Sequence, residues 1–143
     1  MTIKLSWEPG YDRLPRLQWT IDDEELAVMS RFGVIHELTE GENVFEQGKT
    51  SDALYLVLEG EVAILKDAAE IARVGQHISF GEMGLLLDQP RSATARAIMD
   101  SRVLELSRSD VEQMLEDEPT WAARLYRVLA ETLAEYLAIS QQR

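Results

Sequence analysis

The segment at residues 80–97 reads FGEMGLLLDQPRSATARA. Its pattern is typical of the end of a strand, one or two turns of helix, a turn at Pro90 and a second strand. A short helix between strands exposes its first backbone N–H groups, which lack partners inside the helix and favour an anion. Gly81 lets the backbone approach a ligand because glycine carries no Cβ. The segment therefore predicts an anion site inside a β domain.

Three polar side chains give this segment its chemistry. Arg91 can direct two N–H donors at phosphate oxygens, a geometry that lysine does not reproduce, and Ser92 adds a hydroxyl and a backbone N–H. Glu82 would repel an anion unless the ligand also carries a hydroxyl from which the carboxylate accepts. A phosphate beside a hydroxyl describes a sugar phosphate or a cyclic nucleotide. The alternative is a solvated Glu82–Arg91 ion pair on a surface turn, a common arrangement that contributes little energy.

The order of these residues is similar to that of a known family. Residues 80–97 resemble the phosphate-binding cassette of cyclic nucleotide-binding domains, with Phe-Gly-Glu and then Pro-Arg-Ser-Ala-Thr at the family's spacing. The resemblance continues on both sides of the cassette and leaves only residues 1–20 outside it. The other matching residues are Gly41, Glu42, Val44, Phe45, Gly48, Asp52, Tyr55, Gly60 and residues 103–119.

The resemblance implies a role for each residue of the cassette. Glu82 would accept from the ribose 2′-hydroxyl, Arg91 would bind the cyclic phosphate, and the last helix would meet the base near Tyr136. The expected ligand-binding residues are Gly81, Glu82, Met83, Arg91, Ser92, Ala93 and Tyr136. The expected ligand is cAMP. cGMP is the alternative, because a hydroxyl at the position of Ser92 helps to hold guanine in some relatives. No cofactor is expected.

The rest of the chain fits the fold that the resemblance implies. That fold is mainly β with flanking α: an eight-stranded antiparallel β-roll (a double-stranded β-helix or jelly roll), an N-terminal helix and two C-terminal helices. The sequence itself predicts a helix that ends near Phe32 after a cap at Thr20, and glycine-punctuated strands between residues 34 and 106. It also predicts a helix capped by Ser107 or Ser109 and, after a break at Pro119, a longer helix at residues 121–140. The expected organisation is an extension at residues 1–20 and a binding domain at residues 21–143.

One short motif departs from the family pattern. The family usually shows Gly-x-Gly followed by an acidic residue just before the cassette, whereas this chain reads Gly75-Gln76-His77-Ile78. Histidine tolerates a left-handed backbone better than a β-branched residue does, although less well than glycine. The departure from the family pattern therefore concerns the geometry of this turn and not the binding pocket.

The composition excludes several classes of function. The chain has no cysteine, which rules out disulfides, Cys-ligated zinc, iron–sulfur clusters and a thiolate nucleophile. The net charge of −12 would repel a nucleic acid, and there is no run of 18 apolar residues to span a membrane. His36 and His77 are expected on the surface or in turns, and no catalytic cluster is visible, so we expect neither a metal site nor an enzyme. The sequence predicts a cytoplasmic protein with no nucleic-acid or membrane partner, and it offers no helix-turn-helix module after Arg143.

Two hypotheses for the function remain. In the first, a cyclic nucleotide binds the β-roll and signals through the C-terminal helix to a separate, unknown effector protein. In the second, the chain is a protein-interaction or assembly domain in which ligand binding is vestigial. The last helix carries an apolar row that predicts either packing inside the chain or the seam of a homodimer. This row consists of Leu125, Leu129, Thr132, Tyr136 and Ile139.

Overall fold

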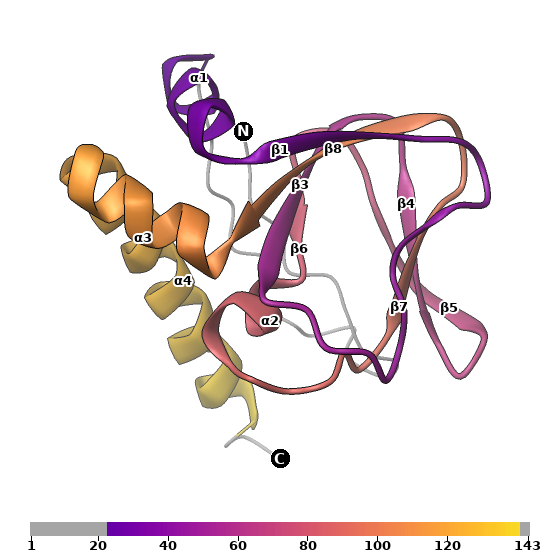
Figure 1. Ribbon diagram of the computed structural model, residues 1–143. Coiled ribbons are helices and arrows are strands. Elements are labelled where there is room, and N and C mark those ends of the chain that lie inside the picture. Colours follow the sequence, from indigo (N-terminus) through magenta and orange to yellow (C-terminus); the bar gives the residue numbers. More distant parts are fainter. Residues whose placement is uncertain (1–22, 141–143) are drawn as a thin grey trace.

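The computed structural model describes residues 23–140, which form four helices and eight strands (Figure 1). The helices are α1 (Asp23–Phe32), α2 (Glu82–Leu86), α3 (Arg108–Asp117) and α4 (Pro119–Ser140). The strands are β1 (Val34–Leu38), β2 (Asn43–Phe45), β3 (Ala53–Glu59), β4 (Val62–Lys66), β5 (Ala69–Val74), β6 (Ser79–Phe80), β7 (Thr94–Ala97) and β8 (Ser101–Ser107). The cap expected at Thr20 and the extension at residues 1–20 lie outside the described residues, so their roles stay predictions.

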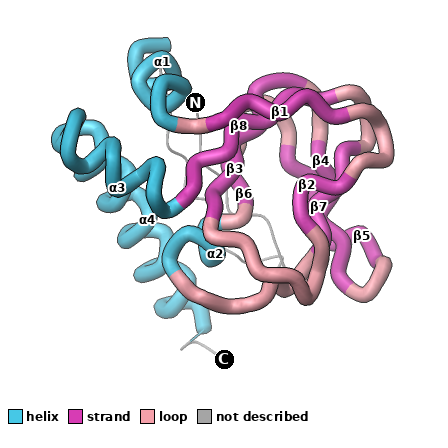
Figure 2. The backbone as a smooth tube through the Cα atoms, in the orientation of Figure 1, coloured by secondary structure: helices cyan, strands magenta, loops and turns pink. Residues whose placement is uncertain are grey.

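The strands form a roll of two four-stranded antiparallel sheets. The strand order is β1-β8-β3-β6 in one sheet and β2-β7-β4-β5 in the other. Helices α1, α3 and α4 lie together on one side of the roll, and α2 connects β6 to β7 at one of its ends (Figures 1 and 2). This arrangement confirms the predicted eight-stranded antiparallel β-roll with one N-terminal and two C-terminal helices.

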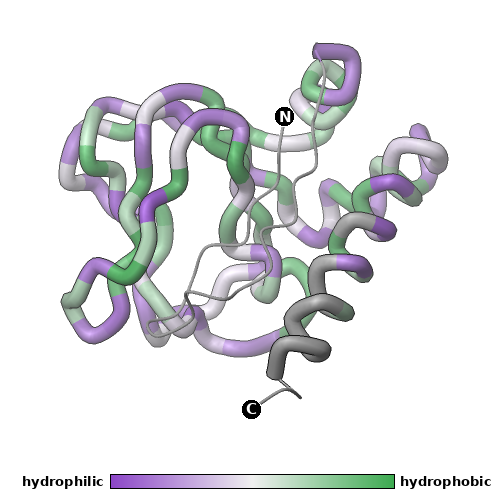
Figure 3. Tube along the Cα trace, turned by 180° about the vertical axis from the view of Figure 1, so that it is seen from behind, coloured by the Kyte–Doolittle hydropathy of each residue, from purple (hydrophilic) through white to green (hydrophobic). Residues whose placement is uncertain are grey.

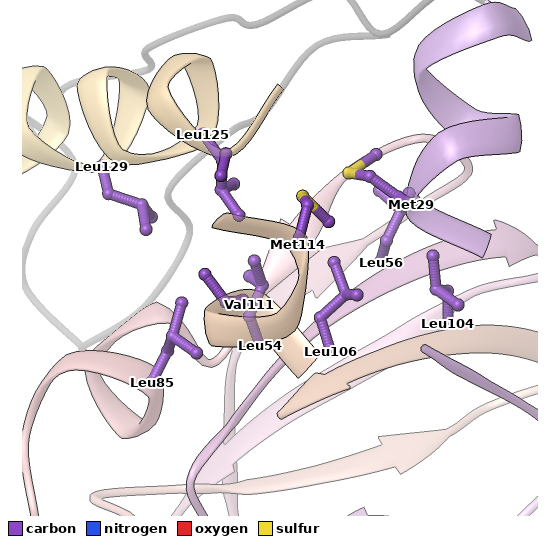
Figure 4. Packing of buried hydrophobic residues seen from close by; sticks show 11 residues of the cluster. Met29, Leu54, Leu56, Leu85, Leu104, Leu106, Val111, Met114, Leu125 and Leu129 are labelled. Carbon is purple, nitrogen blue, oxygen red and sulfur yellow. The ribbon is translucent and has the colours of Figure 1, made fainter. Parts of the chain in front are cut away.

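Strand β3 separates two hydrophobic clusters, because successive side chains of a strand point to opposite faces. Leu54 and Leu56 pack with the helices, whereas Tyr55 and Val57 point into the roll. The helix cluster consists of Met29, Leu54, Leu56, Leu85, Leu104, Leu106, Val111, Met114, Ala122, Leu125 and Leu129 (Figure 4). The roll cluster consists of Ala53, Tyr55, Val57, Val62, Ile64, Val74, Phe80, Ala93, Ala95 and Val103. Both faces of β3 are therefore buried, each in a different core.

Helix α3 begins after the predicted cap Ser107, whereas α4 begins at Pro119, two residues before its predicted start at Trp121. Ser107 caps α3 by accepting from the Asp110 backbone N–H at 3.1 Å, while the Asp110 carboxylate accepts from the Ser107 backbone N–H at 2.9 Å. This reciprocal capping box uses two N–H groups that the helix leaves without partners. Glu118 ends α3, and Pro119 opens α4 at a position that needs no N–H donor.

The first part of the expected dimer seam belongs to the chain's own core. Hydrophobic and hydrophilic residues alternate along α3 and the first turns of α4 (Figure 3). Leu125 and Leu129 are 1% and 2% exposed, respectively, because they pack in the helix cluster. Their assignment to an intermolecular seam is therefore wrong. The side chains of Thr132, Tyr136 and Ile139 lie outside the described part of α4, so that half of the seam stays a prediction.

Within residues 23–140, three non-glycine residues adopt the left-handed backbone conformation in turns. His77 has φ 65°, so the turn before the cassette takes the left-handed conformation with histidine where the family pattern has glycine. Asp67 (φ 51°) and Ala68 (φ 68°) form the two-residue turn between β4 and β5. Two positive φ values in succession are typical of the type I′ turn, whose twist matches that of the paired strands.

Within residues 23–140, no helix is both long enough and apolar enough to cross a membrane.

Candidate functional site

A cavity of about 220 Å³ opens where α2 meets the roll. It is lined by Phe45, Ile64, Phe80, Gly81, Glu82, Met83, Gly84, Gln89, Pro90, Arg91, Ser92 and Ala93. Six of the seven ligand-binding residues expected from the sequence therefore surround one space. The seventh, Tyr136, belongs to α4, and its side chain lies outside the described part of the structure.

Two glycines of the cassette make room for the Arg91 side chain. Gly81 has φ 80° and precedes α2, and a Cβ on it would lie 2.9 Å from Arg91 Nη1. A Cβ on Gly84 would collide with the guanidinium itself. Sequence reasoning gave Gly81 the role of admitting the ligand and gave Gly84 no role. The structure shows that both glycines leave space for the Arg91 side chain, which belongs to the same site.

The chain itself holds the Arg91 guanidinium in place. Nη1 donates to the Gly81 carbonyl at 2.9 Å, and Nη2 donates to Ser51 Oγ at 2.9 Å and to the Ala53 carbonyl at 2.5 Å. The charged group also lies 4.1 Å from the centre of the Phe45 ring, a favourable cation–π contact. Arg91 is only 6% exposed, and this burial lowers the pKa of its guanidinium. Among the described residues, none pairs with its buried Nε–H.

Glu82 is the second buried ionisable group of the cavity. It is 6% exposed, and Oε1 accepts from Ser79 Oγ at 2.7 Å. Burial raises the pKa of the Glu82 carboxyl, and the Ser79 hydrogen bond and the Arg91 charge oppose this effect only in part. Because Glu82 and Arg91 are both buried, the alternative of a solvated ion pair on a surface turn is wrong.

Three aromatic rings form a wall beside Arg91. The ring centres of Tyr55 and Phe80 are 5.5 Å apart, and those of Phe45 and Phe80 are 5.9 Å apart. The hydroxyl of Tyr55 donates to Glu105 Oε1 at 3.0 Å, and burial raises the pKa of Tyr55 to about 12. The wall therefore has no ionisable partner for a ligand near neutral pH, and its contribution to the site is apolar.

Ser51, Ser79 and the Ala53 carbonyl take part in the site, although sequence reasoning did not single them out. Ser51 and Ala53 lie 40 and 38 residues before Arg91 in the chain, and only the folding of β3 beside the cassette brings them together. The nearest signal in the sequence was the match of Asp52 to the family. Ser79 lies three residues before Glu82, a spacing that gives no sign of their contact across the turn at Gly81.

Residues 35–118 match the model of the family described as the cyclic nucleotide-binding domain. The chain belongs to this family. The matched range runs from β1 to the end of α3 and includes every residue that lines the cavity. It stops before the part of α4 that contains Tyr136.

Curated relatives place this domain in proteins of several kinds. The Cyclic AMP receptor protein of Thermus thermophilus is 36% identical over 101 residues, which cover 67% of this chain and 47% of that protein. Glutaminase 1 of Bradyrhizobium diazoefficiens is 31% identical over 121 residues, which cover 84% of this chain and 20% of the relative. This domain therefore spans between a fifth and about half of the length of these relatives.

Solved structures of the family have the same fold. The Catabolite Activator Protein of Thermus thermophilus superposes with a TM-score of 0.70 at 30% identity and covers 85% of this chain and 60% of its own. A cyclic nucleotide-binding domain from Methylobacillus flagellatus has a TM-score of 0.72 at 26% identity, with coverages of 87% and 73%. A structure from work on a cyclic-GMP-dependent signalling pathway in bacterial phytopathogenesis has a TM-score of 0.70 at 32% identity, with coverages of 80% and 96%. Together with the family match, these similarities identify a ligand-binding regulatory domain.

Proposed function

We propose that this domain binds cAMP in the cavity between α2 and the roll and signals through α4 to a separate effector protein, without catalysing a reaction. The observation that supports this proposal best is the buried Arg91 guanidinium, whose Nε–H has no partner among the described residues. A buried donor without an acceptor costs about 1–3 kcal/mol. A phosphate oxygen at this position would remove that cost.

The charge distribution favours a small, locally held anion over a polyanion. The chain carries a net charge of −12, so a nucleic acid would be repelled by most of the surface. Three of the five N–H groups of Arg91 bond to Gly81, Ser51 and Ala53, which leaves two for a ligand. We therefore propose that Arg91, Ser92 and the Ala93 backbone bind the cyclic phosphate. The effector that receives the signal is then a protein and not a nucleic acid.

Glu82 supports a ligand that has a hydroxyl beside its phosphate. A buried carboxylate whose pKa is raised by burial is costly in an empty pocket, and it gains a further hydrogen bond when a ribose hydroxyl donates to it. We assign the 2′-hydroxyl to Glu82. The preference for cAMP over cGMP rests on the Arg91-Ser92 pair, which resembles that of the cAMP-binding catabolite activator, and on the similarity to the Cyclic AMP receptor protein of Thermus thermophilus.

Isothermal titration calorimetry with cAMP and with cGMP tests the ligand. We expect wild-type protein to bind cAMP more tightly than cGMP. Arg91→Leu should abolish binding, and Arg91→Lys should weaken it because lysine lacks the forked geometry. Arg96→Leu is the matched control: Arg96 is an exposed arginine of β7 that donates to Asn43 and does not line the cavity. Thermal melts establish that each variant is folded.

The outcomes separate the two hypotheses. If wild-type protein shows neither heat nor a thermal shift with millimolar cAMP or cGMP, ligand binding is rejected and the assembly-domain hypothesis takes its place. If Arg96→Leu weakens binding as much as Arg91→Leu does, the cavity is not the site. Tighter binding of cGMP would reverse the assignment of the base while leaving the cavity in place.

We also propose that the domain forms a homodimer through the part of α4 beyond Leu129. The helix runs to Ser140, and the sequence continues its apolar row beyond Leu129 with Thr132, Tyr136 and Ile139. Sedimentation equilibrium with and without cAMP tests this proposal on the full chain. A mass of two chains in either condition would support the dimer, and a monomer in both conditions would reject it.

A further inference from the structure

Arg108, the first residue of α3, bonds to the end of the cassette helix α2. Its Nε donates to the Leu85 carbonyl at 3.1 Å, and its Nη2 donates to the Gly84 carbonyl at 3.4 Å. Its Nη1 lies 3.1 Å from Asp88 Oδ1, just beyond α2. One guanidinium thus contacts three successive parts of the segment that carries the ligand site. Arg108 itself does not line the cavity.

These contacts benefit α2 and not the helix to which Arg108 belongs. A positive charge in the first turn of a helix opposes the helix dipole, so Arg108 is unfavourable for α3. The capping box of Ser107 and Asp110 stabilises the start of α3 without it. Helix α2 has no basic residue in its own last turn, and Arg108 supplies the missing positive charge to the carbonyls at its C-terminal end.

The backbone of Arg108 is attached to the other side of the ligand site. Its N–H donates to the Asp52 carbonyl at 2.9 Å. The residues on either side of Asp52 are Ser51 and Ala53, which accept from the Arg91 guanidinium. The start of α3 is therefore bonded both to the segment at Ser51–Ala53 that holds the Arg91 guanidinium and to α2, whose first residue is Glu82.

Movement of α3 would be passed on to α4 through the helix cluster. Val111 and Met114 of α3 are buried in the same cluster as Leu125 and Leu129 of α4 (Figure 4). Leu85 of α2 also belongs to this cluster, but apolar contacts are not directional and let two surfaces slide. Hydrogen bonds from a guanidinium to carbonyls fix both distance and orientation.

We propose that Arg108 is the positioning residue that couples the ligand-binding cassette to α3 and α4. This inference rests on the proposed function. When a ligand shifts α2, the carbonyls of Gly84 and Leu85 carry the Arg108 side chain with them, and α3 follows. Without Arg108 the ligand still binds, but its effect ends at the cassette.

Hydrogen exchange measured by mass spectrometry on the full chain, with and without cAMP, tests the coupling, and calorimetry on the same samples gives the affinity. The variants are Arg108→Ala, Arg108→Lys and Asp88→Ala. Asp88→Ala is the matched control because it removes only the exposed ion pair, which contributes little. Arg108→Lys keeps the charge and folds with less risk, but a lysine cannot bond to both carbonyls in one plane.

In the ligand-free state, Arg108→Ala should speed exchange in residues 82–88 about tenfold, since bonds from a charged donor are lost. With cAMP, wild-type protein should change its exchange in both α2 and α3–α4. Arg108→Ala should keep the change in α2, lose most of the change in α3–α4, and keep its Kd within about tenfold of wild type. Arg108→Lys should fall between the two, and Asp88→Ala should match wild type.

Equal exchange in Arg108→Ala and wild type would overturn the inference, whether or not cAMP binds. If wild-type protein fails to bind cAMP, the proposed function fails, and the ligand-free exchange of residues 82–88 still decides whether Arg108 positions α2. If Asp88→Ala reproduces the effect of Arg108→Ala, the surface ion pair accounts for it and the carbonyl contacts do not.

Discussion

Replacing Glu82 by glutamine should stabilise the ligand-free domain and weaken cAMP binding. Glu82 is 6% exposed, and burial raises the pKa of its carboxyl, so its ionisation near neutral pH costs stability. Glutamine has nearly the same shape, and its Oε1 can still accept from Ser79 Oγ. It cannot serve the ribose hydroxyl as a charged acceptor, so the affinity should fall by about tenfold or more.

The size of the stability change follows from opposing contributions. Burial of an ionised carboxylate costs on the order of several kcal/mol. The Ser79 hydrogen bond, made at 2.7 Å, loses about 1 kcal/mol when its acceptor becomes neutral. The attraction to Arg91 is also lost, and it is the weakest of the influences that lower the pKa of Glu82. We expect a net gain of about 1 kcal/mol in the free energy of unfolding, which is a rise of roughly 3 °C in Tm for a domain of this size.

The gain should depend on pH with a definite sign. Below the ordinary carboxyl value of 4.5, Glu82 is protonated in both the folded and the unfolded chain. As the pH rises from 4.5 through the raised folded-state pKa, the unfolded state loses its proton first, and the wild type loses stability relative to Glu82→Gln. The difference between the two proteins should therefore be smallest at the acid end and reach a plateau above the folded-state pKa.

Urea unfolding followed by circular dichroism between about pH 4 and pH 8 measures this difference. Glu116→Gln is the matched control, because Glu116 is exposed on α3 and the substitution changes the net charge equally. Calorimetry with cAMP completes the comparison. If Glu82→Gln is less stable than both the wild type and the control at neutral pH, the attraction between Glu82 and Arg91 outweighs burial and the reasoning is refuted.

Three further predictions concern the backbone around the two cores. Ala68→Gly should raise the free energy of unfolding by about 0.5–1 kcal/mol in urea, because Ala68 has φ 68°, whereas Ala69→Gly in β5 should lower it. Ser107→Ala should lower the same free energy by about 1 kcal/mol through loss of the capping box, and an unchanged urea midpoint would contradict this. Gly33→Ala should lower Tm, at a cost of about 1–3 kcal/mol, because a Cβ there would collide with the Glu105 carbonyl; a Tm equal to that of wild type would show that β8 can move aside.

Local signals in the sequence were enough to predict the secondary structure of the cassette and the ends of the helices. Gly81 and Pro90 bound the short helix α2 and its turn, and Ser107 begins α3, because turns and caps depend on a few adjacent residues. His77 departs from the family's glycine, and the sequence left its turn geometry open; the structure shows a left-handed conformation there.

The contacts of the cassette could not be read in the same way. Arg91 finds its acceptors on Ser51 and Ala53, in a segment that the roll brings beside it from far along the chain. The burial of Glu82 likewise depends on the packing of α2 against β3 and is not visible in its neighbours. Leu125 and Leu129 show the limit of periodicity: an apolar row predicts a buried face, but it does not tell whether the chain itself or a second copy buries it.

The two faces of strand β3 have a consequence for insertions and deletions. Tyr55 packs in the roll cluster, on the side of the ligand site, whereas its neighbours Leu54 and Leu56 pack in the helix cluster. Successive residues of β3 therefore serve the ligand site and the helix packing in turn. Adding or removing one residue within β3 would exchange the faces, placing leucines inside the roll beside Phe45 and Phe80 and the tyrosine among the helices. Such a change would damage both cores at once, whereas an added residue in the Asp67–Ala68 turn would lengthen only a hairpin tip. Tolerance of length variation in this domain should therefore be lowest in β3 and highest in its turns.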